Sequence, residues 1–335
     1  MRKNINKIDY SQKLNLIETQ IAIKFLKEKF QKLLEKELNL LRVSAPLFVE
    51  TKTGLNDGLN GIEKPVNFSV KGIDDNIEIV QSLAKWKRMA LKKYSFPINS
   101  GLYTDMNAIR KDENIDFIHS LYVDQWDWEL VIGENDRNLN YLKKIVRKIY
   151  KCIYKLNQIL KNKFDKLELE LPNKITFIST KELEDRFPDL SRKEREDEIC
   201  RIYKAVFIYQ IGWPLSDGLP HDGRASDYDD WNLNGDLLIY YPLYDMGLEI
   251  SSMGIRVDEH SLLKQVAFKK EEFKLNNSYC NSILNKTLPN TIGGGIGQSR
   301  LSMLLLEKAH IGEVQSSIWP KKEKESLNKW NIDLL

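Results

Sequence analysis

The sequence predicts an α+β protein in which a central, mostly antiparallel sheet is flanked by helices. A long N-terminal helix, several strands, a helical middle, further strands and a final helix follow one another. This order differs from the regular strand–helix alternation of a parallel sheet. The chain also lacks a GxxxxGK[ST] motif and a GxGxxG motif placed after a strand, so a P-loop or dinucleotide-binding fold is disfavoured.

Composition narrows the class of protein. The 335 residues are 42% hydrophobic and 30% charged, which is typical of a soluble globular protein. The 51 basic and 48 acidic side chains give a net charge of +3, which argues against nucleic acid as the main partner. Cys152, Cys200 and Cys280 are too widely spaced for a zinc site or disulfide framework, so we expect a reducing cytoplasm. We expect no membrane segment, because no apolar run approaches ~20 residues.

The N-terminal part is predicted to be one amphipathic helix over residues 11–40 and one short strand over residues 42–50. Pro46 cannot donate a backbone hydrogen bond, so this strand is expected at a sheet edge or bend. A long helix followed by an edge strand also suggests a dimer surface. Six apolar side chains are expected on one helix face: Leu14, Ile17, Ile21, Phe25, Leu33 and Leu34.

Residues 51–94 are predicted to contain a Gly- and Asn-rich loop, two strands (66–70 and 77–80) and a helix. Within the loop, Asp57 is interpreted from local sequence as a turn residue. Ser82 is a candidate N-cap of the helix. Of the helix cations Lys85, Lys87 and Arg88, we expect some to be solvated and one to point toward a site.

Two strands are predicted over residues 101–114 and 117–130, with Arg110 at the end of the first. In the second strand, Gln125 and Asp127 fall on one face of an otherwise largely apolar segment. Polar side chains there are costly to bury unless they bind something. A solvated face is the alternative, but the neighbouring tryptophans favour a site.

The second half is predicted to contain helices over 138–163 and about 179–201, then strands around an acidic loop. That loop does not match the EF-hand spacing, so a dedicated calcium site is rejected. Asp236 is expected to open the next strand. In the strand 247–257, an unbulged backbone would place Glu249, Ser251, Met253 and Ile255 on one face. Glu249 suits a hard cation such as Mg2+.

The stretch TIGGGIGQSRLSMLLL (291–306) is predicted to lead from a glycine-rich segment into a helix near Gly297. Two interpretations stay open. The amide groups at the helix start, with Arg300, could bind an anion such as phosphate. Alternatively, the glycines let a helix pack closely on a sheet.

Together, the motifs RVSAPLFVE, SLAKWKR, AIRKDE, YVDQWDWE, YDDW, LNGD, EISSMGIR and TIGGGIGQSRLSMLLL resemble the ammonia-dependent asparagine synthetases (aspartate–ammonia ligases) almost end to end. That family is similar to the catalytic core of class II aspartyl- and asparaginyl-tRNA synthetases. The resemblance implies a single catalytic domain over residues 1–335, a homodimer with the helix 11–40 contributing, and no anticodon-binding domain. It implies ATP and Mg2+ as cofactors and a β-aspartyl adenylate as intermediate.

The resemblance also implies roles for individual residues. Arg110 would hold the α-phosphate, while Asp236 and Glu249 would bind Mg2+. For aspartate, Gln125, Asp127 and Ser82 match the α-amino site, and Arg256 and Lys87 match the side-chain carboxylate site. Asp57 and Asp229 match acidic residues of an ammonium site. The remaining nucleotide-binding positions are Ser120, Val123, Ile250, Ser251, Gly295 and Arg300, and the catalytic set is Arg110, Asp57, Gln125 and Asp229.

One departure from the family pattern is a shortened loop expected at 231–235, between YDDW and LNGD. No glutaminase-like domain with an N-terminal Cys is present in the sequence, so free ammonia is the expected nitrogen donor. Two alternatives remain: a compact aminoacyl-tRNA synthetase-like enzyme and a non-catalytic paralogue. The paralogue is disfavoured because Arg110, Glu249 and Arg300 are all present.

Overall fold

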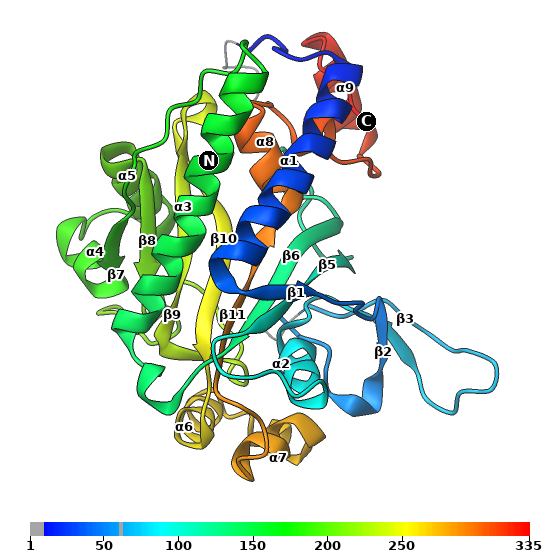
Figure 1. Cartoon of the computed structure of the whole chain (residues 1–335), viewed down its shortest axis with the longest axis vertical. Helices are drawn as coiled ribbons and strands as arrows, with labels where there is room; N and C mark the ends of the chain where they lie inside the picture. Colours follow the sequence, from blue (N-terminus) through cyan, green and yellow to red (C-terminus); the bar gives the residue numbers. More distant parts are fainter. Residues whose placement is uncertain (1–9, 60–62) are drawn as a thin grey trace.

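The computed structural model describes residues 10–59 and 63–335. Figure 1 shows a long sheet with helices on both faces and a small sheet that projects from one side. The helices are α1 (Leu16–Leu38), α2 (Ala84–Lys93), α3 (Leu139–Lys163), α4 (Thr180–Arg186), α5 (Arg192–Tyr203), α6 (Glu259–Lys269), α7 (Ser278–Leu284), α8 (Gln298–Leu305) and α9 (Lys321–Lys329). The strands are β1 (Leu40–Arg42), β2 (Phe48–Glu50), β3 (Asn67–Phe68), β4 (Ile77–Ile79), β5 (Gly101–Ile109), β6 (Tyr122–Val131), β7 (Thr176–Ser179), β8 (Ala205–Tyr209), β9 (Asp229–Tyr241), β10 (Met246–Arg256) and β11 (Thr291–Gly297).

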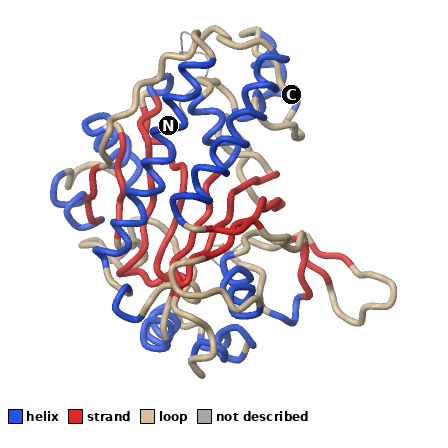
Figure 2. The backbone as a smooth tube through the Cα atoms, viewed as in Figure 1, coloured by secondary structure: helices blue, strands red, loops and turns tan. Residues whose placement is uncertain are grey.

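The large sheet has the strand order β1-β5-β6-β11-β10-β9-β8-β7. Only its two outermost pairings, β1 with β5 and β7 with β8, are parallel. The five pairings between them are antiparallel. This confirms the predicted α+β class with a mostly antiparallel sheet. The projecting sheet is separate and has the order β2-β4-β3 (Figure 2).

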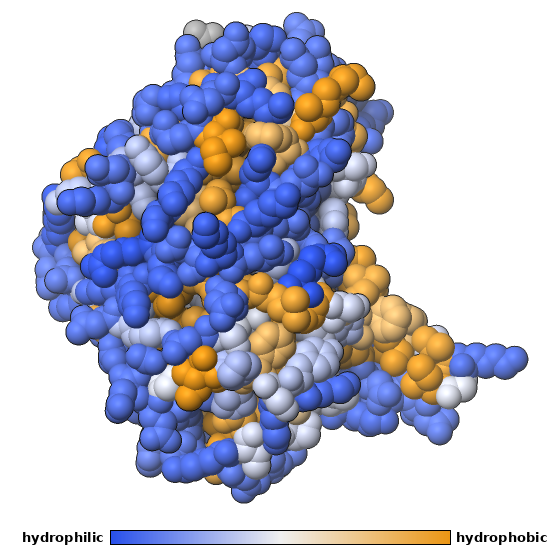
Figure 3. Space-filling view, viewed as in Figure 1, coloured by the Kyte–Doolittle hydropathy of each residue, from blue (hydrophilic) through white to orange (hydrophobic). Residues whose placement is uncertain are grey.

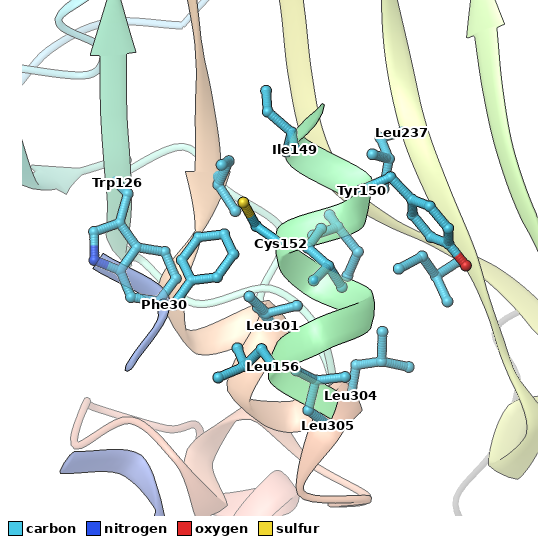
Figure 4. Packing of buried hydrophobic residues seen from close by; sticks show 14 of the residues in the cluster. Phe30, Trp126, Ile149, Tyr150, Cys152, Leu156, Leu237, Leu301, Leu304 and Leu305 are labelled. Carbon is cyan, nitrogen blue, oxygen red and sulfur yellow. The ribbon is translucent and has the colours of Figure 1, made fainter. Parts of the chain in front are cut away.

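Strand alternation assigns the two faces of the large sheet to different partners. On β6, Trp126 and Trp128 join the main core, which α1, α3 and α8 cover. Figure 4 shows Phe30 beside Trp126, and α3 packed against Leu301, Leu304 and Leu305 of α8. The opposite face of the sheet is covered by α2 near β5 and β6 and by α5 near β8, β9 and β10. The site described below lies on this second face.

The predicted strand over 42–50 is wrong as a single element. Its first residue, Arg42, ends β1, which pairs with β5 in the large sheet, while Phe48 begins β2 in the small sheet. Pro46 lies between the two strands. The helix at 11–40 is confirmed as α1, but its predicted apolar face is partly wrong. Ile17 and Ile21 are 71% and 52% exposed, because the buried stripe runs through Ala22, Leu26, Phe30 and Leu34.

Two expectations about β9 and β10 are also wrong. Residues 231–235 form no loop, because β9 continues from Asp229 to Tyr241, and Asp236 therefore lies inside the strand. In β10, pairing with β9 shifts register between Glu249 and Ser251. This bulge breaks the alternation, so Met253 and Ile255 enter the main core while Glu249 faces the cavity described below.

Several other expectations are confirmed, including the helices α3, α4 and α5 and the helix start near Gly297. The three cysteines are free and buried. Ser82 is not the N-cap of α2, since Leu83 occupies that position, although the Ser82 hydroxyl accepts the Ala84 amide. No described helix has the length and apolarity needed to cross a membrane.

Phe30 offers a test of the main core, because its ring is wholly buried with its centroid 4.7 Å from that of Trp126. We expect Phe30→Ala to lower the free energy of unfolding by about 3–5 kcal/mol, since it leaves a cavity. Urea denaturation measures this. Lys24→Ala changes an exposed side chain of the same helix and should stay within about 0.5 kcal/mol. Equal effects of the two variants would contradict the packing.

Candidate active site

One cavity of about 360 Å³ gathers almost every residue that the sequence singled out. It lies over β6, β11 and β10 and is bordered by the start of α2, the loop after β5 and the segment before β9. Asp236 is the one predicted residue that does not line it. The predicted residues that do are Asp57, Ser82, Lys87, Arg110, Ser120, Val123, Gln125, Asp127, Asp229, Glu249, Ile250, Ser251, Arg256, Gly295 and Arg300.

The glycines of β11 make room for the polar side chains of the neighbouring strands. β11 lies between β6 and β10, with Gly293 opposite Glu129 and Gly295 opposite Asp127. A Cβ at Gly293 would collide with the Glu129 carboxylate and approach the Arg256 guanidinium. A Cβ at Gly295 would collide with the Gln125 amide. The glycines therefore make room for side chains of the neighbouring strands, and not for a helix packed on the sheet, as one of the two interpretations drawn from the sequence expected.

The other interpretation, an anion at the start of α8, is corrected in one respect. The amide of Ser299 in the first turn donates to Oδ1 of Asp124 at 3.0 Å, so a carboxylate of the chain itself already lies there. Arg300, one residue further on, still lines the cavity. Its Nη1 donates to the Glu249 carbonyl at 3.1 Å and lies 3.9 Å from the Glu249 carboxylate.

A buried network of charges forms the floor of the cavity. Arg256 donates from Nε and Nη2 to the two Glu129 carboxylate oxygens at 2.9 and 2.6 Å, and from Nη1 to Asp229. Lys87 lies 3.1 Å from Asp127 Oδ1 and donates to the Gly294 carbonyl at 3.0 Å. All five side chains are at most 4% exposed, so these two cations and three carboxylates interact with one another with little help from water.

The pKa values in this network follow from burial and from these partners. Burial favours the neutral form of Glu129, but Arg256, together with Lys87 and the Thr291 hydroxyl, outweighs it and the Glu129 pKa is lowered. For Asp229, burial outweighs the same guanidinium, and the pKa is raised. Burial also lowers the pKa of Lys87, against the pull of Asp127. Arg256 therefore keeps Glu129 ionised beneath the floor.

Arg110 is well placed to meet an anion in the cavity. It follows β5 directly, and its backbone amide donates to Leu121 at 2.8 Å, which fixes the turn toward β6. Its Nη2 makes one long contact of 3.4 Å with the Gln81 carbonyl. Its Nε is buried and has no hydrogen-bond partner. Most of its donors are therefore not used by other described residues.

Asp236 and Glu249 lie on the adjacent strands β9 and β10. Oδ2 of Asp236 accepts from Arg224, while its Oδ1 is buried and finds no hydrogen-bond partner within residues 10–59 and 63–335. Burial raises the pKa of Asp236 to about 7; Glu249 and Asp222 add to that effect and Arg224 opposes it. The described residues hold no group of three or more His, Cys, Asp or Glu arranged for a metal. Mg2+ usually takes only one or two carboxylate ligands from a protein. Asp236, which has one unpaired oxygen, and Glu249 fit that number.

Asp57 forms the turn that its local sequence predicts, and its carboxylate is also buried. It is 2% exposed, and its Oδ1 accepts the Leu59 amide at 3.0 Å. Its Oδ2 is buried and has no hydrogen-bond partner among the residues that the structure describes. Burial raises the Asp57 pKa to about 6, although the nearby Lys85 ammonium opposes this. A carboxyl group of this kind can exchange a proton near neutral pH.

Several site residues were missed or misjudged from the sequence. Glu129 lies two residues beyond Asp127 on the same face, a spacing that could have identified it as the partner of Arg256. Lys85, Lys87 and Arg88 are all buried, so the expectation that some are solvated is wrong. Arg88 instead donates to the carbonyls of Val257 and Pro289, and Lys85 pairs with Asp227. No local pattern indicates these long-range partners.

Comparison with solved structures first identifies the fold class of the protein. The chain superposes on asparaginyl-tRNA synthetase from Entamoeba histolytica, solved with asparaginyl-adenylate, with a TM-score of 0.66, 12% identity and coverage of 90% of this chain and 66% of that one. The Pyrococcus horikoshii enzyme, solved with the same adenylate, gives a TM-score of 0.65 at 16% identity, covering 90% and 70%. At these identities the likeness shows the fold, that of class II aminoacyl-tRNA synthetases.

The family follows from closer relatives. The aspartate–ammonia ligase family matches residues 17–331. The chain is 55% identical over 326 residues to an aspartate–ammonia ligase of Fusobacterium nucleatum, covering 97% of this chain and 99% of that protein. It is 56% identical over 328 residues to one of Clostridium perfringens, covering 98% of each. The chain belongs to the aspartate–ammonia ligase family.

Gly295 tests the role of the glycine strand. We expect Gly295→Ala to reduce turnover at least about tenfold, because overpacking of ~1–3 kcal/mol falls on Gln125 and its neighbour Asp127. Steady-state kinetics measures the effect. A raised KM for aspartate would indicate that Gln125 and Asp127 are the side chains that have been displaced. Gly133→Ala is the control, since its Cβ would meet only the end of the Asp136 side chain. Wild-type kinetics for Gly295→Ala would refute the role.

Proposed function

We propose that the protein makes L-asparagine from L-aspartate and ammonia, using ATP and passing through a β-aspartyl adenylate. Membership of the aspartate–ammonia ligase family supports the overall reaction. The observation that carries the mechanism is the composition of the cavity. It brings two arginines with unused donors, Arg110 and Arg300, together with the carboxylate of Glu249 and the charged floor around Lys87 and Arg256.

In the first step, a β-carboxylate oxygen of aspartate attacks the α-phosphorus of ATP. A new O–P bond forms, the bond to the β-phosphate bridge breaks, and pyrophosphate leaves. Negative charge gathers on the α-phosphate oxygens, and the planar guanidinium of Arg110 stabilises it with paired donors. Arg300 holds the phosphate tail or covers the adenine. Further nucleotide contacts come from Ser120, Val123, Ile250, Ser251 and Gly295, which line the same cavity.

Mg2+ supplies charge neutralisation for the triphosphate when it is bound, and Asp236 and Glu249 are the residues that would hold it. Oδ1 of Asp236 is available, and the Glu249 side chain is 44% exposed toward the cavity. Arg224 fixes the other Asp236 oxygen. The bulge after Glu249 supports this arrangement, because it separates the carboxylate from the core-facing part of β10.

The amino-acid substrate is recognised by charge at both ends. Asp127 and Gln125, with Ser82 nearby, accept the α-ammonium group, and Lys87 and Arg256 bind the side-chain carboxylate. Arg256 commits three of its five N–H groups to Glu129 and Asp229, which leaves donors for a ligand. Two cations at the side-chain end favour aspartate over asparagine as the acid that is activated.

In the second step, ammonia attacks the carbonyl carbon of the adenylate. A C–N bond forms, the C–O bond to phosphate breaks, AMP leaves, and the amide nitrogen loses a proton. Because ammonium predominates at neutral pH, a base must first remove its proton. Asp57 is the base in this proposal, with Oδ2 facing the cation. Asp229 adds negative charge, although one of its oxygens is held by Arg256.

We further propose a cytoplasmic homodimer whose single catalytic domain extends over the chain. Apolar side chains that α1 leaves exposed, Ile17 and Ile21, support a subunit contact, as do Leu41 of β1 and Phe48 of β2. Figure 3 shows apolar surface where the small sheet leaves the body. Burying such a surface favours association.

The reaction itself is tested by incubating the purified protein with ATP, Mg2+, aspartate and ammonium. We expect asparagine, AMP and pyrophosphate in equal amounts, detected by chromatography. Absence of AMP would remove the enzymatic proposal. AMP formation that required tRNA would favour the alternative of a compact aminoacyl-tRNA synthetase-like enzyme.

Arg110 is tested by Arg110→Ala. We expect loss of AMP formation by at least about a hundredfold with the melting temperature unchanged, because charge on the α-phosphate loses its main donor. Arg192→Ala removes a surface arginine paired with Asp217 and should leave activity intact. Wild-type turnover of folded Arg110→Ala protein would refute the role.

Asp57 is tested by Asp57→Asn, which keeps the shape and removes the base. Amide formation should fall by ~10²–10⁴-fold, the usual contribution of a positioned base. Aspartate-dependent exchange of pyrophosphate into ATP should persist, because adenylation needs no ammonium. Equal loss of both activities would contradict the assignment.

A further inference from the structure

A second buried ion pair lies directly behind Asp57 and outside the charged floor described above. Lys85 Nζ of α2 lies 2.6 Å from Asp227 Oδ2, in the segment before β9, and their side chains are 7% and 1% exposed. A buried pair of this kind costs desolvation, and well-packed apolar residues would often stabilise a fold as well or better. Its position beside the proposed base therefore calls for a functional explanation.

Lys85 also holds the loop that carries Asp57. Its ammonium group donates to the Gly54 carbonyl at 3.2 Å and to the Asn56 carbonyl at 3.4 Å. The contact with Asp227 is an ion pair, since neither Asp227 carboxylate oxygen has a hydrogen-bond partner among the described residues. The neighbouring Gln81 amide donates to the Asp57 carbonyl at 3.1 Å, which adds a second link between this loop and the start of α2.

The charges around Asp57 are few and can be named. Lys85, from α2, and Arg110, after β5, are the cations that face it, while Asp227 is the anion. The phenol of Tyr228 lies close enough to Asp57 to interact electrostatically with its carboxylate. The only hydrogen bond to the Asp57 carboxylate that the described residues provide is from Leu59, so its free oxygen depends on these longer-range charges.

We propose that the Lys85–Asp227 ion pair positions Asp57 and adjusts its charge, so that its free oxygen captures ammonium and takes its proton. Lys85 fixes the loop and keeps Asp57 ionised, while Asp227 offsets Lys85 so that Asp57 remains basic enough to act. Both are positioning residues, because neither is required to touch the substrate. This inference rests on the proposed role of Asp57 in ammonia-dependent amide formation.

Two variants that nearly keep side-chain size should shift the pH profile in opposite directions. Lys85→Gln removes the cation near Asp57, so the acidic limb of ammonium-dependent turnover should move about one unit to higher pH. Asp227→Asn removes the like charge, so the limb should move about one unit to lower pH. A purely structural role would not give shifts of opposite sign.

Hydroxylamine serves as the alternative nucleophile for comparison with ammonia. It is a far weaker base than ammonia, and it is therefore largely uncharged at neutral pH. It needs no proton removed before attack, so aspartyl hydroxamate formation at pH 7 should remain within about threefold of wild type for both variants. Because the Asp57 pKa is about 6, a one-unit rise should lower ammonium-dependent turnover about ninefold at pH 5 and only about twofold at pH 7, so the position of the acidic limb is the deciding readout. Pyrophosphate exchange should be unchanged. Retained exchange with unshifted ammonium profiles would overturn this inference while leaving the adenylate proposal intact.

Asp230→Asn is the control, because Arg137 Nη2 and Asp230 Oδ2 form a partly buried ion pair, 2.5 Å apart, whose residues do not line the cavity. Asp230→Asn should leave the pH profile of ammonium-dependent turnover unchanged. Thermal melting checks the folding of all variants, and Asp227→Asn decides the question alone if Lys85→Gln does not fold. Parallel loss of ammonium and hydroxylamine use by folded variants would overturn the inference.

Discussion

The site depends on the side-chain space above β11, which the glycines of this strand leave open. Side chains at Gly293 and Gly295 would occupy the space that Glu129, Arg256 and Gln125 now fill. With that space free, opposite charges from β6 and β10 meet across β11 and neutralise one another beneath the cavity. Burial of these charges would otherwise be too costly.

This arrangement gives the cavity a floor whose polar groups are oriented before any ligand arrives. Arg256 is held by Glu129, and Lys87 by Asp127 and the Gly294 carbonyl. Preorganised groups stabilise developing charge without having to reorient during the reaction. By contrast, Arg110 and the free oxygens of Asp57 and Asp236 have few partners among the described residues, which is consistent with groups that await a ligand.

Local patterns in the sequence predicted much of the fold, and the resemblance to a family supplied most of the cavity lining, such as Arg110. The period-two polarity of Gln125 and Asp127 identified the strand β6, but the glycine run near Gly295 was predicted only as the entry to a helix and not as the strand β11. The other predictions that failed concern contacts between residues that are far apart in the sequence. Neither the bulge after Glu249 nor the division of residues 42–50 between two sheets leaves a local signal. The burial of Lys85 likewise depends on Asp227, 142 positions later in the chain.

The central claim is that the cavity activates the distal carboxylate of aspartate by joining it to AMP. Aspartate carrying oxygen-18 in its β-carboxylate tests this most directly, with the products analysed by mass spectrometry after a single turnover. The account predicts one labelled oxygen in the phosphate of AMP and one in the asparagine amide. Label in inorganic phosphate or pyrophosphate, or no transfer to any phosphate, would contradict it.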